Sequence, residues 1–591
     1  MCGLSGEIRF DGKRASEERV RAMMDMQAAR GPDGSGFADF GWAAFGHRRL
    51  KIVDLSDRAA QPMSDEGSDH CIVFNGCIYN HNELREELRK KGHQFFSASD
   101  TEVILRAHQE WGANCVERLN GMFAFAIHDP DRNEIFLARD RLGIKPMYLL
   151  EEPGCIRFAS FLPALIRGAS ETPDIDRDAL HNYMTFHSVV PAPRTILEPV
   201  RKLPPATRMT IRRDGTSDSE VYWRPHFRCR EGDEDVSFGD WRDQVRDSLN
   251  LAVQRRLTGD VPVGVLLSGG LDSSLIVGLL AEHGQTGLNT FSVGFEAAGE
   301  EKGDEFEYSD IVAKAFGTEH HQIRVDSEEL LEHLPDCFGA MSEPMVSHDN
   351  IGFYLLSREV SKHVKVVQSG QGADEVFAGY HWYPPMMDSD TPLEDYCQVF
   401  FDRDHEEFCR AVDERFVNGD ASKAFVRQHF AEADAERAVD KAFHIDTTVM
   451  LVEDPVKRVD NMTMAWGLEA RVPFLDHELV ELAARIPSGY KVDGGGKYVL
   501  KEMARSVIPS EVIDRPKGYF PVPELKYLKG RSLQFVKDTL NSRVANERGL
   551  FRRDYLDTLL DAPHEHLTPL RGSKLWQVAV LEAWLQRHIE A

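Results

Sequence analysis

Residues 261–274 read Val-Pro-Val-Gly-Val-Leu-Leu-Ser-Gly-Gly-Leu-Asp-Ser-Ser, an apolar run that ends in a glycine turn. An apolar run without polar alternation is typical of a strand that is buried on both faces of a sheet. We expect a helix over residues 275–283 and a second strand over residues 290–293, which together form a βαβ unit of a parallel sheet. The run 363–368 also ends in a glycine turn and predicts a third strand.

The glycine turn over residues 268–274 predicts an anion site. Glycines allow the backbone to approach a phosphate, and the N–H groups, the hydroxyls and the N-terminus of the following helix all favour negative charge. The turn lacks the Gly-Lys-Ser/Thr of a Walker A loop. Asp272 makes sense in such a loop chiefly as a Mg²⁺ ligand. Asp374, in the string Ser-Gly-Gln-Gly-Ala-Asp-Glu after the third strand, offers a second carboxylate, with a helix-capping acid as its alternative interpretation.

The chain on either side of this motif indicates two domains. Its 591 residues exceed what one hydrophobic core supports. Residues 225–240 are polar and acidic and are interpreted as a linker, after which Asp240 can cap an amphipathic helix. That helix places four apolar residues on one face: Val245, Leu249, Ala252 and Val253. We expect an N-terminal domain over residues 1–215 and a C-terminal domain over residues 240–591, mainly helical beyond residue 396.

The N-terminal part mixes strands and helices. Its predicted elements are a strand over residues 71–74 that ends at the turn Asn75-Gly76, a helix over 82–91, and a hairpin of 121–127 and 134–138. These short elements predict an α/β domain.

Cys2 could be a nucleophile. If the initiator methionine is removed, its thiol lies beside a free α-amine, which titrates at roughly pH 8 and can act as an internal base. Taken alone, an ordinary small residue is the better interpretation. Asn75 and Gly76 could also supply an amide and a backbone N–H as an oxyanion hole. Arg49 and Asp100 carry the charges needed to hold an amino acid, although such residues are more often solvated at the surface.

The composition is that of a globular protein, with 42% hydrophobic and 28% charged residues. A formal net charge of -27 makes nucleic acid and anionic membrane surfaces poor partners. Nine cysteines without a CxxC pair argue against a disulfide scaffold and a zinc site. Neither a signal peptide nor a membrane-spanning apolar run is evident, so the cytoplasm is the expected compartment. The sequence leaves open whether the protein forms a homodimer.

The N-terminal motifs resemble the class II glutamine amidotransferase domain. They are Met-Cys-Gly at the start, Arg-Gly-Pro-Asp at 30–33, Arg-Leu-Lys-Ile-Val at 49–53, Asn-Gly-Cys-Ile-Tyr-Asn at 75–80, Ser-Asp-Thr-Glu at 99–102 and Arg-Asp-Arg-Leu-Gly-Ile-Lys-Pro at 139–146. The resemblance implies an αββα sandwich of the N-terminal nucleophile type, in which Cys2 forms a glutamyl thioester and releases ammonia. Asn75 and Gly76 would stabilise the oxyanion. The implied glutamine-binding residues are Arg49, Ile52, Val53, Asn75, Gly76 and Asp100. Asparagine synthetases usually carry Glu where this chain has Cys77, which leaves Asp100 as the main partner of the substrate ammonium.

The C-terminal motifs resemble the pyrophosphate-loop, ATP-binding domain of the glutamine-hydrolysing asparagine synthetases. They include Gly-Lys-Tyr-Val-Leu-Lys-Glu at 496–502 besides the two glycine turns. The resemblance implies an acyl-adenylate, with Mg²⁺ held by Asp272 and Asp374 and the transition state stabilised by Lys497. The implied ATP-binding residues are Leu267, Ser268, Gly269, Gly270, Asp272, Ser273, Ser274, Val293, Ser369 and Gly370. Arg458, Asp460 and the segment 469–476 are interpreted as mostly architectural, or as lining an ammonia route.

Two departures concern the carboxylate acceptor. Gln371 stands where asparagine synthetases generally have Glu, and the segment 343–350 also differs from theirs. The chain looks most similar to the N-acetylglutaminylglutamine amidotransferases in the segments 183–187, 190–194, 343–350 and 368–383. This likeness implies amidation of that dipeptide, a step in making a compatible solute, with His348 and Gln371 near the acceptor. An asparagine synthetase acting on aspartate is the enzyme alternative. A catalytically silent sensor of ATP and glutamine is the alternative from another class.

Overall fold

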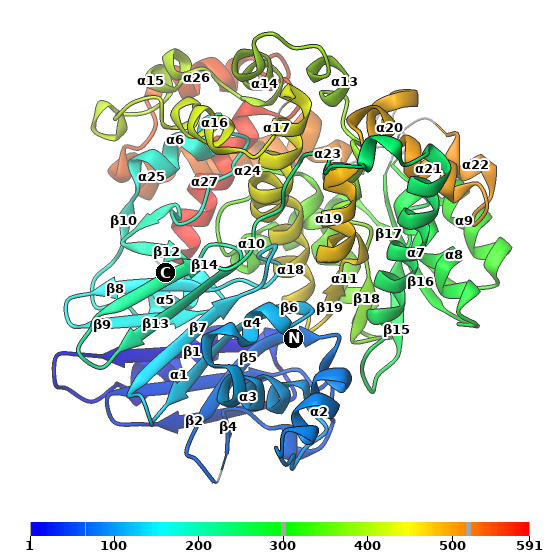
Figure 1. The fold of residues 1–591 in the computed structure, drawn as a ribbon. Coiled ribbons are helices and arrows are strands. Elements are labelled where there is room, and N and C mark those ends of the chain that lie inside the picture. The colour runs from blue at the N-terminus through cyan, green and yellow to red at the C-terminus, as the bar shows by residue number, and fades with distance from the viewer. Residues whose placement is uncertain (1, 66, 297–302, 436, 516–521, 590–591) are drawn as a thin grey trace.

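The N-terminal domain is built on two six-stranded sheets in the computed structural model, which describes residues 2–65, 67–296, 303–435, 437–515 and 522–589 (Figure 1). The first sheet has the order β12 (Val200–Lys202), β8 (Tyr148–Glu152), β9 (Cys155–Ala159), β1 (Gly3–Arg9), β3 (Ala43–Arg49) and β2 (Gly34–Asp39). The second has the order β14 (Ser217–Val221), β13 (Thr207–Arg212), β7 (Glu134–Arg139), β6 (Gly121–Asp129), β5 (Cys71–Ile78) and β4 (Met63–Ser64).

The two sheets face each other across an apolar core. Residues from both sheets, such as Leu4, Phe45, Val73 and Phe158, pack in it. The helices α1 (Glu17–Met26) and α5 (Leu162–Gly168) cover the first sheet, and α2 (His81–Lys90) and α3 (Asp100–Trp111) cover the second. Each sheet thereby buries both of its faces, and the predicted αββα sandwich is confirmed.

The predicted hairpin is confirmed by the pairing of β6 with β7, and the helix expected over 82–91 corresponds to α2. The predicted turn at Asn75-Gly76 is wrong. Strand β5 runs through both residues, which pair with Ala124 and Phe123 of β6. A Cβ at Gly76 would lie 2.1 Å from the carbonyl oxygen of Met122, so the glycine allows a close approach of two strands rather than a turn.

The connection between the domains differs in detail from its prediction. Strand β14 lies beyond the expected boundary at residue 215 and pairs with β13. Helix α7 (Phe238–Arg255) follows the linker and buries Val245, Leu249, Ala252 and Val253, as predicted. Its cap, however, is Ser237, whose Oγ accepts a hydrogen bond from the Asp240 backbone N–H at 3.2 Å. The prediction of Asp240 as the cap was therefore wrong.

A five-stranded parallel sheet forms the centre of the C-terminal domain. Its order is β17 (Glu319–Val325), β16 (Asn289–Phe295), β15 (Val263–Leu266), β18 (Val366–Gln368) and β19 (Glu469–Arg471). The predicted strands correspond to β15, β16 and β18. The edge strands β17 and β19 were not predicted, because the first is rich in histidine and charge and the second, Glu-Ala-Arg, lacks the apolar run that marks β18. The strand order reverses at β15, and parallel sheets bind ligands at the carboxyl ends of their strands at such a point.

Helices fill the rest of the C-terminal domain. The helix α8 (Leu271–Glu282) follows β15, and α18 (Lys457–Met464) leads into β19. The last helix, α27 (Lys574–His588), packs against α10 (Ser327–Ala340). Within the described ranges no helix has the length and apolar character needed to span a membrane. The helical character expected beyond residue 396 is confirmed.

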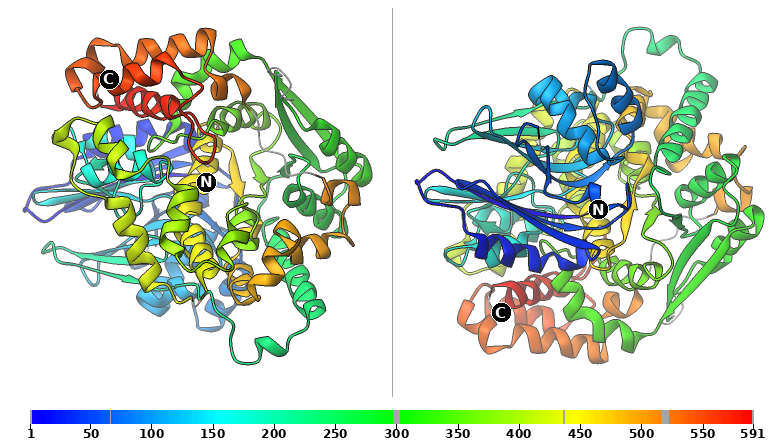
Figure 2. Two further views of the ribbon diagram at one scale, coloured as in Figure 1. Left: turned by 90° about the horizontal axis from the view of Figure 1, so that it is seen from above. Right: turned by 90° about the horizontal axis from the view of Figure 1, so that it is seen from below.

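Strand β19 and helix α18 lie where the two domains meet. Figures 1 and 2 show the N-terminus beside these yellow elements, with the blue and cyan sandwich on one side and the green parallel sheet on the other. Polar contacts cross the boundary nearby: Lys365 Nζ lies 2.7 Å from Asp33 Oδ2, and the Asp260 backbone N–H donates to the Ile52 carbonyl at 2.8 Å. Elements of both domains can therefore contribute to one cavity.

Candidate active sites

A cavity beside the N-terminus contains nearly all the residues predicted to bind glutamine. Its lining includes Cys2, Arg49, Ile52, Val53, Gly76 and Asp100. These residues come from the start of β1, the end of β3 with the loop after it, β5, and the first turn of α3. The fold thus brings together residues that are almost one hundred positions apart in the sequence.

Cys2 is held in this cavity by Asn75. The backbone N–H of Cys2 donates to Asn75 Oδ1 at 2.9 Å, and Asn75 Nδ2 donates one of its two protons to Ser160 Oγ at 3.4 Å. Burial raises the pKa of the Cys2 thiol, so attack by this sulfur requires a nearby base. Asn75 does not itself line the cavity, but it positions the nucleophile's backbone.

Opposite charges are fixed on the walls of the same cavity. Arg49 donates to the carbonyl oxygens of Ser56 at 2.9 Å and Asp54 at 2.5 Å, which holds its guanidinium in place. Asp100 Oδ2 accepts from the Ile78 backbone N–H at 3.0 Å. A cation and a carboxylate on the walls of one cavity suit the carboxylate and ammonium of an amino acid.

One lining residue was not predicted to be there. Glu469 comes from β19 of the C-terminal domain and lines the N-terminal cavity. Its Oε1 lies 2.6 Å from Arg471 Nε, and Arg471 Nη2 lies 3.6 Å from Cys77 Sγ. No local pattern in the sequence signals this contact, because it depends on how the two domains meet.

A second cavity opens at the carboxyl ends of β15, β16 and β18. The predicted residues that line it are Leu267, Ser268, Asp272, Ser273, Val293, Ser369, Gly370, Gln371 and Asp374. Gly269 and Gly270 of the loop before α8, and Ser274 of α8 itself, are not part of its lining. Gly269 is required for close packing, because a Cβ there would lie 2.5 Å from the Ser309 backbone nitrogen. Ser274 is buried within α8.

Two carboxylates that line one end of this second cavity contact Lys497, which is not itself among the lining residues. Lys497 Nζ lies 2.7 Å from Asp272 Oδ2 and 2.9 Å from Asp374 Oδ1. Burial opposes the charge on Lys497, but the two carboxylates raise its pKa. Asp374 is not a helix cap, since α12 (Ala373–Phe377) begins after Gly372 without a side-chain cap bond. The oxygens of Asp272 and Asp374 can thus share one cation, which fits a Mg²⁺ site.

The backbone around Lys497 is built for this contact. Lys497 has a φ of 56° in the left-handed region and follows three glycines with positive φ. A Cβ at Gly379 would lie 1.9 Å from Asp374 Oδ1 and 2.4 Å from Lys497 Cε. Gly379 therefore leaves the space in which the lysine reaches the carboxylates, a role that was not predicted.

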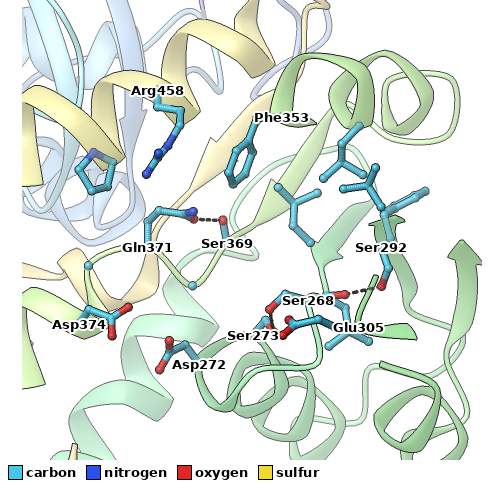
Figure 3. Close-up of a pocket in the computed structure, with 18 of the residues that line it drawn as sticks. Ser268, Asp272, Ser273, Ser292, Glu305, Phe353, Ser369, Gln371, Asp374 and Arg458 are labelled. Carbon is cyan, nitrogen blue, oxygen red and sulfur yellow. Dashed lines mark hydrogen bonds between the residues drawn. The ribbon is translucent and has the colours of Figure 1, made fainter. Parts of the chain in front are cut away.

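Figure 3 shows Asp272 and Asp374 at one end of the cavity and Arg458 and Phe353 at the other, with Gln371 between them. Arg458 belongs to α18, and its Nη1 donates to Ser347 Oγ at 2.5 Å. It was interpreted as mostly architectural, yet it is the one Arg or Lys among the described lining residues. Gln371 is hydrogen bonded to Ser369.

Glu375 adds a carboxylate to the middle of this cavity. It accepts a hydrogen bond from the Tyr380 hydroxyl at 2.5 Å, and both residues belong to the lining. Burial and the neighbouring Asp374 charge raise the pKa of Glu375 to about 7. A proton-accepting group is therefore present although residue 371 is an amide.

His348 does not lie where its predicted contact with the acceptor would require it to be. It does not belong to the lining of the cavity, and its ring centroid lies 6.0 Å from that of Trp576. Burial lowers its pKa to about 4. Its neighbours reach the site instead, because Ser347 and Asp349 both contact Arg458. The segment 343–350 thus acts on the cavity through Arg458.

Buried ion pairs connect the two cavities. Arg30 Nε donates to the Cys2 carbonyl at 3.3 Å, and Arg30 Nη1 lies 2.9 Å from Asp460 Oδ2. Asp460 also bonds Lys145 Nζ at 3.1 Å. Since Asp460 and Arg458 lie on the same helix, α18, one rigid element contacts both the backbone of Cys2 through Arg30 and the second cavity.

Comparison with known proteins agrees with this arrangement. The asparagine synthase family matches residues 244–586, and the glutamine amidotransferase domain matches residues 1–223. Glutamine-hydrolysing asparagine synthetase 1 of Bacillus subtilis is 33% identical over 630 residues, covering 100% of this chain and 97% of that protein. Asparagine synthetase 3 of the same organism is 32% identical, covering 95% and 93%. Asparagine synthetase B of Escherichia coli is 29% identical, covering 88% and 82%. The chain belongs to the glutamine-hydrolysing asparagine synthetase family.

Proposed function

We propose that this protein transfers the amide nitrogen of glutamine to a carboxylate that it activates with ATP as an acyl-adenylate, and that the acceptor is N-acetylglutaminylglutamine. The observation that carries the proposal is the presence in one chain of two cavities, one lined by Cys2 and one lined by Asp272 and Asp374, both of which contact Lys497. The first suits glutamine hydrolysis and the second suits ATP cleavage.

In the first cavity, Cys2 Sγ attacks the glutamine amide carbon and the α-amine of a processed N-terminus takes the proton. The Gly76 N–H and the Asn75 amide stabilise the oxyanion. Arg49 binds the substrate carboxylate, and Asp100 binds its ammonium. Ammonia leaves as the thioester forms, and water then releases glutamate.

In the second cavity, the loop 268–274 and residues Ser369 and Gly370 bind ATP. Asp272 and Asp374 would hold Mg²⁺, which supplies positive charge to the phosphates when bound. Lys497, located between these carboxylates, stabilises charge that develops during adenylation. AMP and pyrophosphate are the expected nucleotide products.

The other end of the second cavity supports this choice of acceptor. The Arg458 guanidinium can pair with a carboxylate, and the neutral Gln371 replaces an acid. Aspartate carries an ammonium group that benefits from an acidic partner, whereas the acylated dipeptide does not carry one. The 343–350 segment, through Ser347 and Asp349, holds Arg458 in place.

Aspartate is the second candidate acceptor, because the relatives listed above are named asparagine synthetases. The test supplies N-acetylglutaminylglutamine and aspartate separately, with ATP, Mg²⁺ and glutamine, and measures AMP and the product mass. Turnover of the dipeptide is the expected result. Turnover of aspartate alone would reject the dipeptide, and glutamine and ATP binding without AMP from either acceptor would favour a sensor.

A further inference from the structure

We propose that the Glu469 carboxylate of the C-terminal domain binds the α-ammonium group of glutamine together with Asp100, an inference that rests on the glutaminase role proposed above. The glutamine site would then be completed across the domain boundary, and full affinity for glutamine would require strand β19 to be in place.

The position of Glu469 supports this role. Among the described residues that line the N-terminal cavity, all except Glu469 come from the first 101 residues of the chain. Glu469 is held firmly, because its backbone N–H donates to the Lys365 carbonyl at 2.8 Å and the strand pairs with β18. The C-terminal domain therefore presents a rigid carboxylate to a cavity whose other described lining residues belong to the N-terminal domain.

The neighbouring residues keep Glu469 ionised. Alternate residues of a strand share a face, which places Arg471 beside Glu469 with Nε and Oε1 2.6 Å apart. Burial favours the neutral acid, but the positive charges of the chain's N-terminus and of Arg471 lower the pKa of Glu469 to about 2. Glu469 consequently carries negative charge at neutral pH.

Cys77 explains why a second carboxylate is needed. Position 77 faces the same cavity, and burial raises the pKa of the Cys77 thiol to about 12, so this side chain carries no charge. Asp100 is buried as well, and burial together with the Glu469 charge raises the pKa of its carboxyl. Two carboxylates near one another repel, and each positive charge beside them lowers that repulsion further. An ammonium group between Asp100 and Glu469 would relieve that repulsion.

The experiment uses the full-length Glu469→Gln variant and two substrates, glutamine and its deaminated analogue 4-carbamoylbutanoate. A hydrogen bond to a charged group contributes about 1.5–3 kcal/mol, so kcat/KM for glutamine hydrolysis should fall roughly 10- to 150-fold, mainly through KM. The kcat/KM of the variant for the analogue should stay within about twofold of the wild-type value, because the analogue has no ammonium group for Glu469 to bind. If turnover of the analogue is too slow, its competitive inhibition constant is compared instead.

Two further variants separate recognition from folding. Glu7→Gln is the matched control, because Glu7 is a buried carboxylate paired with Arg157 at 2.7 Å, and it is not part of the described lining of either cavity. It should lower the melting temperature without changing the ratio of glutamine to analogue kcat/KM. The double variant Glu469→Gln/Cys77→Glu should recover glutamine affinity by restoring a carboxylate on the same wall.

Equal losses for glutamine and the analogue in Glu469→Gln, or no loss for either, would overturn the inference. A wild-type protein that does not hydrolyse glutamine at all would instead reject the proposed function itself. The two failures are therefore distinguishable.

Discussion

The two cavities differ in which parts of the chain supply the residues that line them. The N-terminal cavity receives most of its lining from one domain, with cation and carboxylate placed for a small zwitterion. In the C-terminal cavity, loops after parallel strands form the end that we propose binds ATP, and α18 and Gln371 form the end that we propose binds the acceptor. Local motifs thus supply the proposed sites for glutamine and the nucleotide, whereas the proposed acceptor site depends on side chains brought together by tertiary packing.

The Cys2→Ala variant is expected to produce the largest difference between glutamine-dependent and ammonia-dependent synthesis. Loss of the nucleophile should lower glutamine-dependent synthesis by about 10⁴-fold or more. Synthesis driven by added ammonium chloride should stay within about twofold, because the second cavity is untouched. Product formation is measured with each nitrogen source. Loss of both activities would contradict the division of labour between the cavities.

Asp374→Asn tests the opposite cavity. Removing one of two carboxylates around Lys497 and the expected Mg²⁺ should lower AMP formation about 10²- to 10³-fold with either nitrogen source. Glutaminase activity, measured as glutamate released, should be retained. Excess EDTA should reproduce the effect in wild type and be reversed by Mg²⁺. Normal AMP formation by the variant would remove Asp374 from the site.

Arg458→Met tests the acceptor end. Loss of a charge-assisted bond to a carboxylate should raise the acceptor KM roughly 10- to 100-fold. The KM for ATP should change by less than about threefold, because the ATP end lies on the far side of Gln371 (Figure 3). Initial rates over a range of both substrates provide the measurement. An equal rise in both KM values would indicate that Arg458 only supports the fold.

A smaller change is expected when the connection between the cavities is weakened. In Asp460→Asn, Arg30 and Lys145 lose their shared carboxylate in a buried position. Glutamate released per AMP formed should rise about two- to fivefold as hydrolysis becomes uncoupled from synthesis. Asp557→Asn is a control for an exposed ion pair and should leave this ratio unchanged. An unchanged ratio in Asp460→Asn would show that this pair does not couple the sites.

Some features of the fold and of the cavities could be predicted from the sequence and others could not, for physical reasons. The parallel sheet and the loops after β15 and β18 followed from local apolar runs and glycine turns, whereas the sandwich followed from the resemblance to the glutamine amidotransferase domain. Strand β19 lacks an apolar run, and the Ser237 cap lies only three residues from the predicted Asp240. The proximity of Glu469 to Asp100 and of Arg458 to Gln371 depends on contacts between distant segments, which single-residue patterns do not encode.

An isotope competition can measure directly whether nitrogen released in the first cavity is transferred to the second. The wild-type enzyme is supplied with amide-¹⁵N glutamine, ATP, Mg²⁺, the acceptor that supports AMP formation in the assay proposed above, and an excess of unlabelled ammonium chloride. Mass spectrometry then measures ¹⁵N in the amide product. We predict a labelled fraction well above that of ammonia in solution, because nitrogen released at Cys2 is used at the second cavity. A product labelled only to the level of the dissolved ammonia would contradict the account.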